Sequence, residues 1–468
     1  MNKTVLACAL ALGFAGTVQA TDITPVPVDP EGSGLFDNTP ATPVGGNPGT
    51  TVGEQRRIVY QFAADLWEAV LDSPVETKVQ ASFADLDCTA TSATLGSAGT
   101  QYVFAEFDGG VEHTWYGNAL ANALAGTDLS PPVDEEDNGN EIVSQFNSRL
   151  GASNCLAGSG WYYGLDGDTP AGEISFLDVV MHEIGHGLNF QGFYSLTTGA
   201  PFGGASSAFP DIYSRNVFDD ASGMAWVDMT NAQRVTAATA GKLVWTGANV
   251  TAEASANLGG VVTLAVIGNR PASYPMVTAV YGPPATPDSF GASKLVYGTD
   301  ASGSHLGCQA FPGGAFTGKA VLLDRGTCSF KTKTLNAQNA GATRVVIANN
   351  ATTGFPGMGD DPAVTATITI PSIGITKASG VNLRKTMSAG VTVALQESAT
   401  QLSGADAAGH VYLYAPSPLE RGSSFSHFDV SLTPNALMEP FINDDLDAAT
   451  DLDLTPALFK DVGWTLQP

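Results

Sequence analysis

Two histidines and a glutamate are spaced so that they can bind a metal ion and use it. His182, Glu183 and His186 lie in the segment SFLDVVMHEIGHGLNF. Residues four apart share one face of an α-helix, so the two imidazoles can each direct a nitrogen at the same ion. Neutral imidazoles suit zinc, which lowers the pKa of bound water to about 7, and the adjacent carboxylate is placed to take the proton. The pattern predicts hydrolysis of a peptide bond by an activated water.

A catalytic zinc of this kind needs a third protein ligand and keeps one position open for water. A helical glutamate shortly downstream is disfavoured, because none occurs between Glu183 and Glu253. Asp211, in the segment FPDIY, is a minor alternative. The other histidines are candidates as well: His113, His305, His410 and His427. His427 differs from the rest because Met438 follows it in the segment SHFDVSLTPNALMEP.

The helix that carries the two histidines is predicted over residues 175–188. Ser175 and Asp178 have the spacing of an N-terminal cap, and apolar residues recur at intervals of three and four. Periodicity predicts further elements at these positions: helices over 54–72, near 379–388 and over 454–460, and strands over 79–83 and 411–414. Residues 191–275 are rich in loops, and their pattern assigns no element.

A change of pattern marks a separate α/β module, assigned to residues 281–402. Residues 319–324 and 343–348 are typical of buried strands, and the residues between them, 329–340, of a helix. Strand, helix and strand at this spacing predict parallel pairing of the two strands.

The first residues have the features of an export leader. Residues 1–20 contain Lys3, an apolar run and the small-residue pattern Val18-Gln19-Ala20. Residues 21–53 are rich in Pro, Gly and Thr and predict a poorly ordered arm or a short propeptide. No later stretch has the roughly 20 apolar residues of a membrane-spanning helix. We therefore expect a secreted protein, extracellular or in transit through a periplasm, with no stable membrane anchor.

The chain is strongly acidic, with 20 basic and 46 acidic residues. Loss of the leader removes Lys3 and no acid, which leaves a net charge of 19 − 46 = −27. Nucleic acid and anionic membranes are therefore disfavoured as partners. Acidic residues crowd the tail: Asp444, Asp445, Asp447, Asp451 and Asp453. A solvated acidic loop is the preferred interpretation and a calcium site the alternative, because the spacing lacks the EF-hand pattern.

Cysteine usage fits an oxidising compartment. Cys8 belongs to the leader, which leaves an even set: Cys88, Cys155, Cys308 and Cys328. Four cysteines allow three connectivities, and we favour two disulfides, Cys88 with Cys155 and Cys308 with Cys328. The close paired spacing of a cysteine-based metal site is absent from the sequence.

The zinc motif and the end of the chain resemble the metzincin peptidases, in particular their leishmanolysin-like branch, in which an insertion separates the second and third ligands. The matching segments are HEIGHGLNF, SHFDVSLTPNALMEP and LTPALFKDVGW. The resemblance implies an α+β zincin fold, discontinuous in sequence, over residues 54–280 and 403–468. It also implies these roles: His182, His186 and His427 as ligands of one zinc ion, Glu183 as general base, and Met438 as a structural residue beneath the metal. Asn189 replaces the glycine usual in the family, and asparagine tolerates the left-handed conformation expected there.

The inserted module, with DRGTCSF between its strand and its helix, resembles a protease-associated domain. That resemblance implies a non-catalytic role in substrate access, recognition or regulation. Together these features predict a secreted zinc endopeptidase that acts on protein or peptide substrates. The alternative is a catalytically silent secreted protein that binds peptide or glycan and holds a structural zinc. A narrower alternative is hydrolysis of a non-protein amide.

Overall fold

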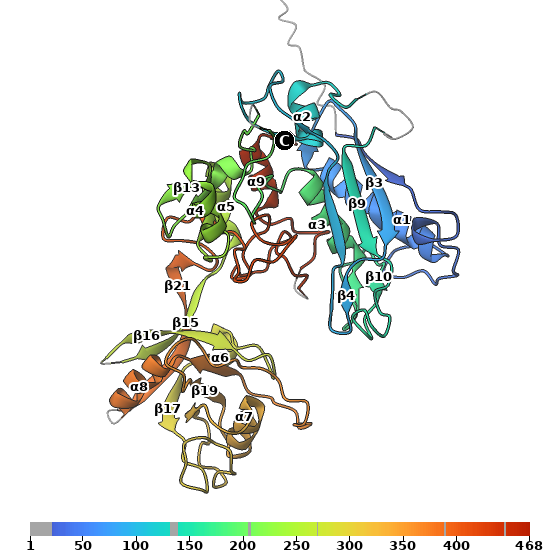
Figure 1. Cartoon of the computed structure of the whole chain (residues 1–468). Helices are drawn as coiled ribbons and strands as arrows, with labels where there is room; N and C mark the ends of the chain where they lie inside the picture. The colour runs from blue at the N-terminus through green and yellow to red at the C-terminus, as the bar shows by residue number, and fades with distance from the viewer. Residues whose placement is uncertain (1–20, 132–138, 205–206, 269, 388–389, 444–445) are drawn as a thin grey trace, which may run out of the picture. The chain divides into compact units, whose positions relative to one another are not determined.

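The protein is described by a computed structural model that covers the following residues: 21–131, 139–204, 207–268, 270–387, 390–443 and 446–468. The predicted leader lies outside them. In these ranges no helix is long and apolar enough to cross a membrane. The chain divides into two compact units: the first comprises the chain up to Leu258 together with Gly404–Pro468, and the second is Gly259–Ser403 (Figure 1).

A four-stranded sheet organises the first unit. Its strands lie in the order β1 (Ile23–Pro27), β3 (Thr77–Ala84), β9 (Ile142–Asn147) and β6 (Gly96–Thr100). The first three strands are parallel, and β6 runs antiparallel to β9 at one edge of the sheet. Buried and partly exposed residues alternate along β3, as the sequence predicts for residues 79–83.

The prediction of a poorly ordered arm over residues 21–53 is wrong. Strand β1 pairs with β3 over its whole length, and Ile23 and Leu35 are fully buried. Pro25 and Pro27 interrupt the hydrophobic period of β1. An edge strand tolerates proline because one row of its N–H groups needs no partner in the sheet.

Helices α1 (Val52–Glu68) and α3 (Phe176–Gly187) pack together beside this sheet (Figure 1). Each is capped at its start. In α3 the Ser175 hydroxyl accepts a hydrogen bond from the Asp178 N–H at 3.1 Å, as its sequence predicts. The indole of Trp67, on α1, donates to the Met181 carbonyl at 3.1 Å.

A second small sheet joins the two sequence segments of the first unit. Strand β14 (Leu243–Trp245) pairs antiparallel with β22 (Val411–Tyr412), and α5 (Ala248–Asn257) packs on α9 (Thr455–Val462). The segment 191–275, which the sequence leaves unassigned, supplies most of this region. The shorter elements of the unit are η1 (Gly34–Phe36), β2 (Leu71–Asp72), β4 (Cys88–Thr89), β5 (Ser92–Ala93), β7 (Val103–Phe104), β8 (Tyr116–Gly117), α2 (Asn118–Ala125), β10 (Trp161–Tyr162), β11 (Ile174–Ser175), η2 (Ser214–Asn216), β12 (Val217–Asp219), β13 (Met224–Ala225), η3 (Trp226–Asp228), α4 (Asn231–Ala237) and β23 (Thr465–Leu466).

The second unit is a closed barrel with helices around it. Its elements are β15 (Gly260–Ile267), β16 (Ala272–Thr278), α6 (Pro287–Phe290), β17 (Ser293–Tyr297), β18 (Ala320–Asp324), α7 (Phe330–Asn339), β19 (Arg344–Ala348), β20 (Ser372–Ile375), α8 (Lys377–Thr386) and β21 (Val391–Leu402). Strands β18 and β19 are parallel with α7 between them, which confirms the predicted βαβ unit. The unit begins at Gly259, earlier than the expected boundary at 281, because β15 pairs with β21 and so belongs to the barrel.

Each unit contains one disulfide. Cys88 is bonded to Cys155 in the first unit, and Cys308 is bonded to Cys328 in the second. This is the connectivity that the sequence favours among the three that four cysteines allow.

Candidate metal centre

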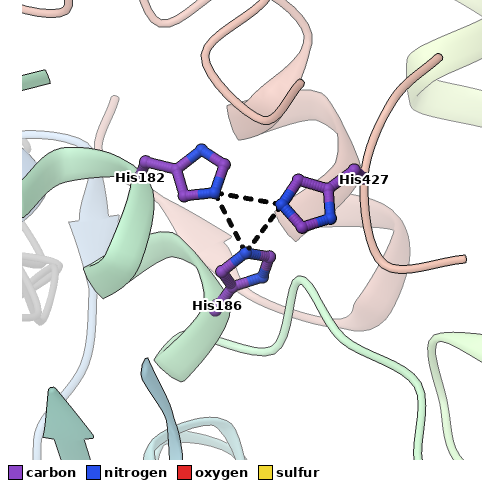
Figure 2. A group of neighbouring side chains, drawn as sticks. All are labelled: His182, His186 and His427. Carbon is purple, nitrogen blue, oxygen red and sulfur yellow. Dashed lines mark hydrogen bonds between the residues drawn. The ribbon is translucent and has the colours of Figure 1, made fainter. Parts of the chain in front are cut away.

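Three histidines converge in the first unit. His182 and His186 come from successive turns of α3, and His427 comes from a segment far along the chain (Figure 2). Their Nε2 atoms form a nearly equilateral triangle, with separations of 3.1 Å, 3.1 Å and 3.2 Å. All three side chains are buried. The structure therefore brings together the three residues for which the sequence predicts zinc binding.

Backbone carbonyls fix the orientation of every ring. Each imidazole donates a hydrogen bond from Nδ1: His182 to Leu437 O at 2.7 Å, His186 to Phe190 O at 2.9 Å and His427 to Ser423 O at 2.7 Å. Because a carbonyl oxygen can only accept, Nδ1 must carry the proton in each ring. The Nε2 atom of each neutral ring is then left with a lone pair.

The neutral state of the rings follows from their burial. Burial lowers the pKa of His182 to about 4, and burial together with neighbouring His182 lowers the pKa of His186 to about 3. The pKa of His427 is held well below its ordinary value by burial and by the other two histidines. At neutral pH, three lone pairs thus face one another at close range. A cation at their centre would turn this repulsion into coordination.

The triangle fits zinc. Four tetrahedral ligands at the zinc–nitrogen distance of about 2.0–2.1 Å stand about 3.3 Å apart. The observed separations of 3.1–3.2 Å are close to that spacing. Among the described His, Cys, Asp and Glu residues, the convergent group consists of these three histidines, which is the number of protein ligands that a catalytic zinc has.

Glu183 lies beside the triad and points at the edge strand β6. Its carboxylate accepts a hydrogen bond from the Ala98 N–H, and a Cβ built on Gly96 would lie 2.6 Å from its Oε1. Its other oxygen, Oε2, is buried and has no hydrogen-bond partner among the described residues. Burial raises the pKa of Glu183 to about 8, although a cation nearby would act in the opposite direction. The side chain is therefore a buried carboxyl with one oxygen available to a proton.

The segment around His427 is held by contacts with distant parts of the first unit. Phe425 has a φ of +77° and packs on Trp226, with ring centroids 4.4 Å apart. The Tyr213 hydroxyl donates to the Phe425 carbonyl at 2.9 Å. The Gly192 N–H, just beyond α3, donates to the Ser426 hydroxyl at 3.2 Å. These bonds fix the backbone on the N-terminal side of His427.

Met438 packs against helix α3. It is fully buried, and its sulfur would lie 2.8 Å from a Cβ built on Gly185, which stands between the two helical histidines in sequence. The adjacent Leu437 carbonyl accepts the Nδ1 proton of His182. Met438 therefore contacts the helix, while its neighbour Leu437 orients the His182 ring.

The end of α3 has the conformation expected from its sequence. Asn189 has a φ of +88°, and its side-chain oxygen accepts a hydrogen bond from the Gly117 N–H at 2.6 Å. Because the chain turns here, the Phe190 carbonyl can accept the hydrogen bond from His186 Nδ1.

The other candidates lie apart from the triad. Asp211 is buried and accepts hydrogen bonds from the Phe193 N–H and from both the N–H and the hydroxyl of Ser214, so its carboxylate shapes a loop. His113 pairs with Glu106 at 2.9 Å. In the part of the acidic tail that the structure describes, the carboxylates do not converge as the histidines do. Asp444 and Asp445 lie outside the described residues.

The groups that orient the three histidines cannot be recognised in the sequence. The three carbonyl acceptors carry no residue signature, because every residue has a carbonyl. Two carboxylates that hold backbone N–H groups of the C-terminal segment also go unpredicted. Asp453 accepts a hydrogen bond from the Leu437 N–H, and Asp178 accepts one from the Ala448 N–H at 3.0 Å. The sequence predicts Asp178 only as part of the helix cap with Ser175. It gives no indication that Asp178 contacts Ala448.

Comparison with known proteins identifies part of the second unit. The sequence model of the PA domain family matches residues 292–383. These residues form a PA domain. Vacuolar-sorting receptors 3 and 4 of Arabidopsis thaliana are each 37% identical to this chain over a segment that is 16% of the chain and 13% of the receptor. The chain thus matches a small fraction of the length of those receptors, and the likeness is of the size of one domain.

Several solved peptidase structures are similar over a limited part of the chain. A peptidase M28 precursor from Shewanella amazonensis is 14% identical, with 30% of this chain and 34% of that chain covered and a TM-score of 0.24. An aminopeptidase from Aneurinibacillus sp. strain AM-1 is 26% identical, with 29% and 30% covered and a TM-score of 0.22. A zinc aminopeptidase from Bacillus subtilis is 19% identical, with 33% and 37% covered and a TM-score of 0.22. At such low TM-scores these similarities carry no argument about the reaction.

Proposed function

We propose that this protein is a secreted zinc-dependent endopeptidase of metzincin type, in which the PA domain is inserted between the second and third ligands. The observation that supports it is the convergence of three imidazole lone pairs beside a buried carboxyl. A structural zinc would call for a fourth side-chain ligand. A catalytic zinc has the three-ligand arrangement found among the described residues. The two disulfides fit export to an oxidising compartment.

The chain's own residues divide the work of hydrolysis. When bound, zinc supplies Lewis-acid polarisation of the scissile carbonyl and acidification of water. Glu183 takes the proton of the attacking water on Oε2 and then delivers it to the leaving nitrogen. The Ala98 N–H holds the Glu183 carboxylate during both transfers. The Nδ1 bonds keep the three rings from rotating.

The edge of strand β6 favours an extended peptide as the substrate. The Leu95 carbonyl and the Gln101 N–H form backbone hydrogen bonds with residues beside or in β9. Because the backbone polar groups of successive residues in an antiparallel strand point to alternate sides, those of Gly96, Ala98 and Thr100 point away from β9. The Ala98 N–H reaches Glu183, so this outward row runs past the proposed general base. A peptide can add to such an edge along the middle of its chain, which favours internal cleavage.

Zinc content and casein hydrolysis of the purified protein test this function. Glu183→Gln should retain zinc and lose activity by about 10²- to 10⁴-fold, the contribution typical of a general base. His427→Ala should lose both zinc and activity. Matched controls are Glu253→Gln and His113→Ala, both at exposed positions, which should leave both measurements unchanged.

Two results would contradict the proposal. Near-normal turnover by Glu183→Gln would remove its role as general base. Full zinc occupancy in every variant without proteolysis in any of them would favour a binding protein with a structural metal.

A further inference from the structure

Gln191 is a hydrogen-bond donor that the fold leaves unused beside the proposed metal centre. Its Nε2 atom is buried and has no hydrogen-bond partner in the ranges that the structure describes. A buried donor without a partner destabilises a fold, and folded proteins rarely contain one. A bound substrate can supply the acceptor that this donor lacks.

The backbone holds Gln191 between the two sequence segments of the site. On one side, the Phe190 carbonyl accepts the Nδ1 proton of His186 at 2.9 Å. On the other side, the Gly192 N–H donates to the hydroxyl of Ser426, which precedes His427. The position of Gln191 is thus fixed relative to two of the three ligands.

The side chain of Gln191 lies against the same edge strand as Glu183. A Cβ built on Gly99 would lie 3.3 Å from Gln191 Oε1 and 3.8 Å from Nε2. Glu183 contacts the same strand at Gly96 and Ala98. The unused amide and the proposed general base therefore lie against β6 within a span of four residues, and the lack of a Cβ at Gly96 and Gly99 lets both side chains approach the strand closely.

We propose that Gln191 binds the substrate main chain, with Nε2 donating a hydrogen bond to a carbonyl oxygen of a peptide that lies extended along β6. The proposal rests on the peptidase function above and adds a specific donor to it. A main-chain acceptor is favoured because every extended peptide presents carbonyls at regular intervals, whatever its side chains. Gln191 would then position substrates of varied sequence.

Two substitutions separate donation from packing. Gln191→Met keeps an unbranched side chain against Gly99 and removes the amide. Gln191→Glu keeps the shape and leaves acceptor oxygens that repel a carbonyl. The matched control is Gln61→Met, an exposed glutamine on α1 that pairs with Asp65.

The test measures casein binding without cleavage. Each substitution is combined with Glu183→Gln in zinc-loaded protein, and fluorescein-labelled casein is titrated by fluorescence anisotropy. Removal of one neutral hydrogen bond should weaken binding about 3- to 10-fold in the Gln191→Met protein. The Gln191→Glu protein should bind more weakly still, while zinc content and melting temperature stay unchanged and Gln61→Met has no effect.

Different failures have different meanings. Equal casein binding with and without Gln191→Met would overturn the role of Gln191 and leave the peptidase function standing. If Gln191→Glu bound casein as tightly as the parent, the side chain at this position would act as a hydrogen-bond acceptor. That result would overturn its assignment as a donor. Failure of the zinc-loaded Glu183→Gln parent to bind casein would overturn the peptidase function, and this inference with it.

Discussion

The two halves of the proposed metal centre are built in opposite ways. Helix α3 supplies His182 and His186 from one regular, fully buried element. His427 lies in the segment 415–440, for which the structure describes no helix or strand. A helix sets the spacing of its ligands by its own hydrogen bonds, whereas a loop has the correct geometry only while distant contacts hold it. Zinc binding should therefore depend on packing far more in the loop half than in the helix half.

The largest expected effect comes from removing a ligand from either half. His186→Ala and His427→Ala should both lose zinc, because each leaves two imidazoles. The loss should exceed the 10- to 100-fold typical of outer contacts. Limited proteolysis should then cut the segment 415–440 faster in both variants, with α3 still protected. Equal protection of the loop in metal-free and metal-bound protein would contradict the expected difference between the helix half and the loop half.

Loss of packing in the loop half should have the next largest effect. Phe425→Ala removes a buried ring that packs on Trp226 and should lower the free energy of unfolding by about 3–5 kcal/mol. It should also weaken zinc binding, because Phe425 lies two residues before His427. Phe441→Ala is the matched control, since that ring is 54% exposed. Calorimetric unfolding and competition with a zinc chelator measure the two effects, and unchanged zinc affinity in Phe425→Ala would contradict the prediction.

The smallest expected effect concerns the contact of Asp178, on the helix, with the Ala448 N–H. Burial raises the pKa of Asp178 to about 6, above its ordinary value of 3.8. Between these two values the folded state binds more protons than the unfolded state, so stability should fall as pH rises from about 4 to about 6. The full effect is at most about 3 kcal/mol, at 1.36 kcal/mol per pKa unit.

Asp178→Asn should flatten this dependence. Urea unfolding of metal-free protein at a series of pH values measures it. The same slope in wild type and Asp178→Asn would show that the carboxyl does not titrate in this range.

The helix half could be predicted from sequence because its determinants are local. The histidine spacing, the Ser175 cap and the left-handed turn at Asn189 all lie within 15 residues, and the structure has each of them. His427 is predicted only through a family resemblance, since nothing near it in sequence requires a metal. Its orientation depends on the carbonyl of Ser423 and on a contact with α3, which no local pattern encodes.

The errors have the same origin. The sequence of residues 21–53, rich in Pro, Gly and Thr, predicts a poorly ordered arm because the strand that pairs with β1, β3, begins only at Thr77. The predicted boundary at 281 is too late because β15 pairs with β21, which comes from the far end of the barrel unit. In both cases the missing information was a pairing between distant strands.

The separation of 241 residues between His186 and His427 has a consequence for biosynthesis. At a synthesis rate of about 5–20 residues per second, the third ligand follows the second by about 10 to 50 seconds. During that interval the nascent chain has two imidazoles and no complete site. The proposed site therefore cannot form before His427 has been synthesised, so we expect no proteolysis from shorter nascent chains.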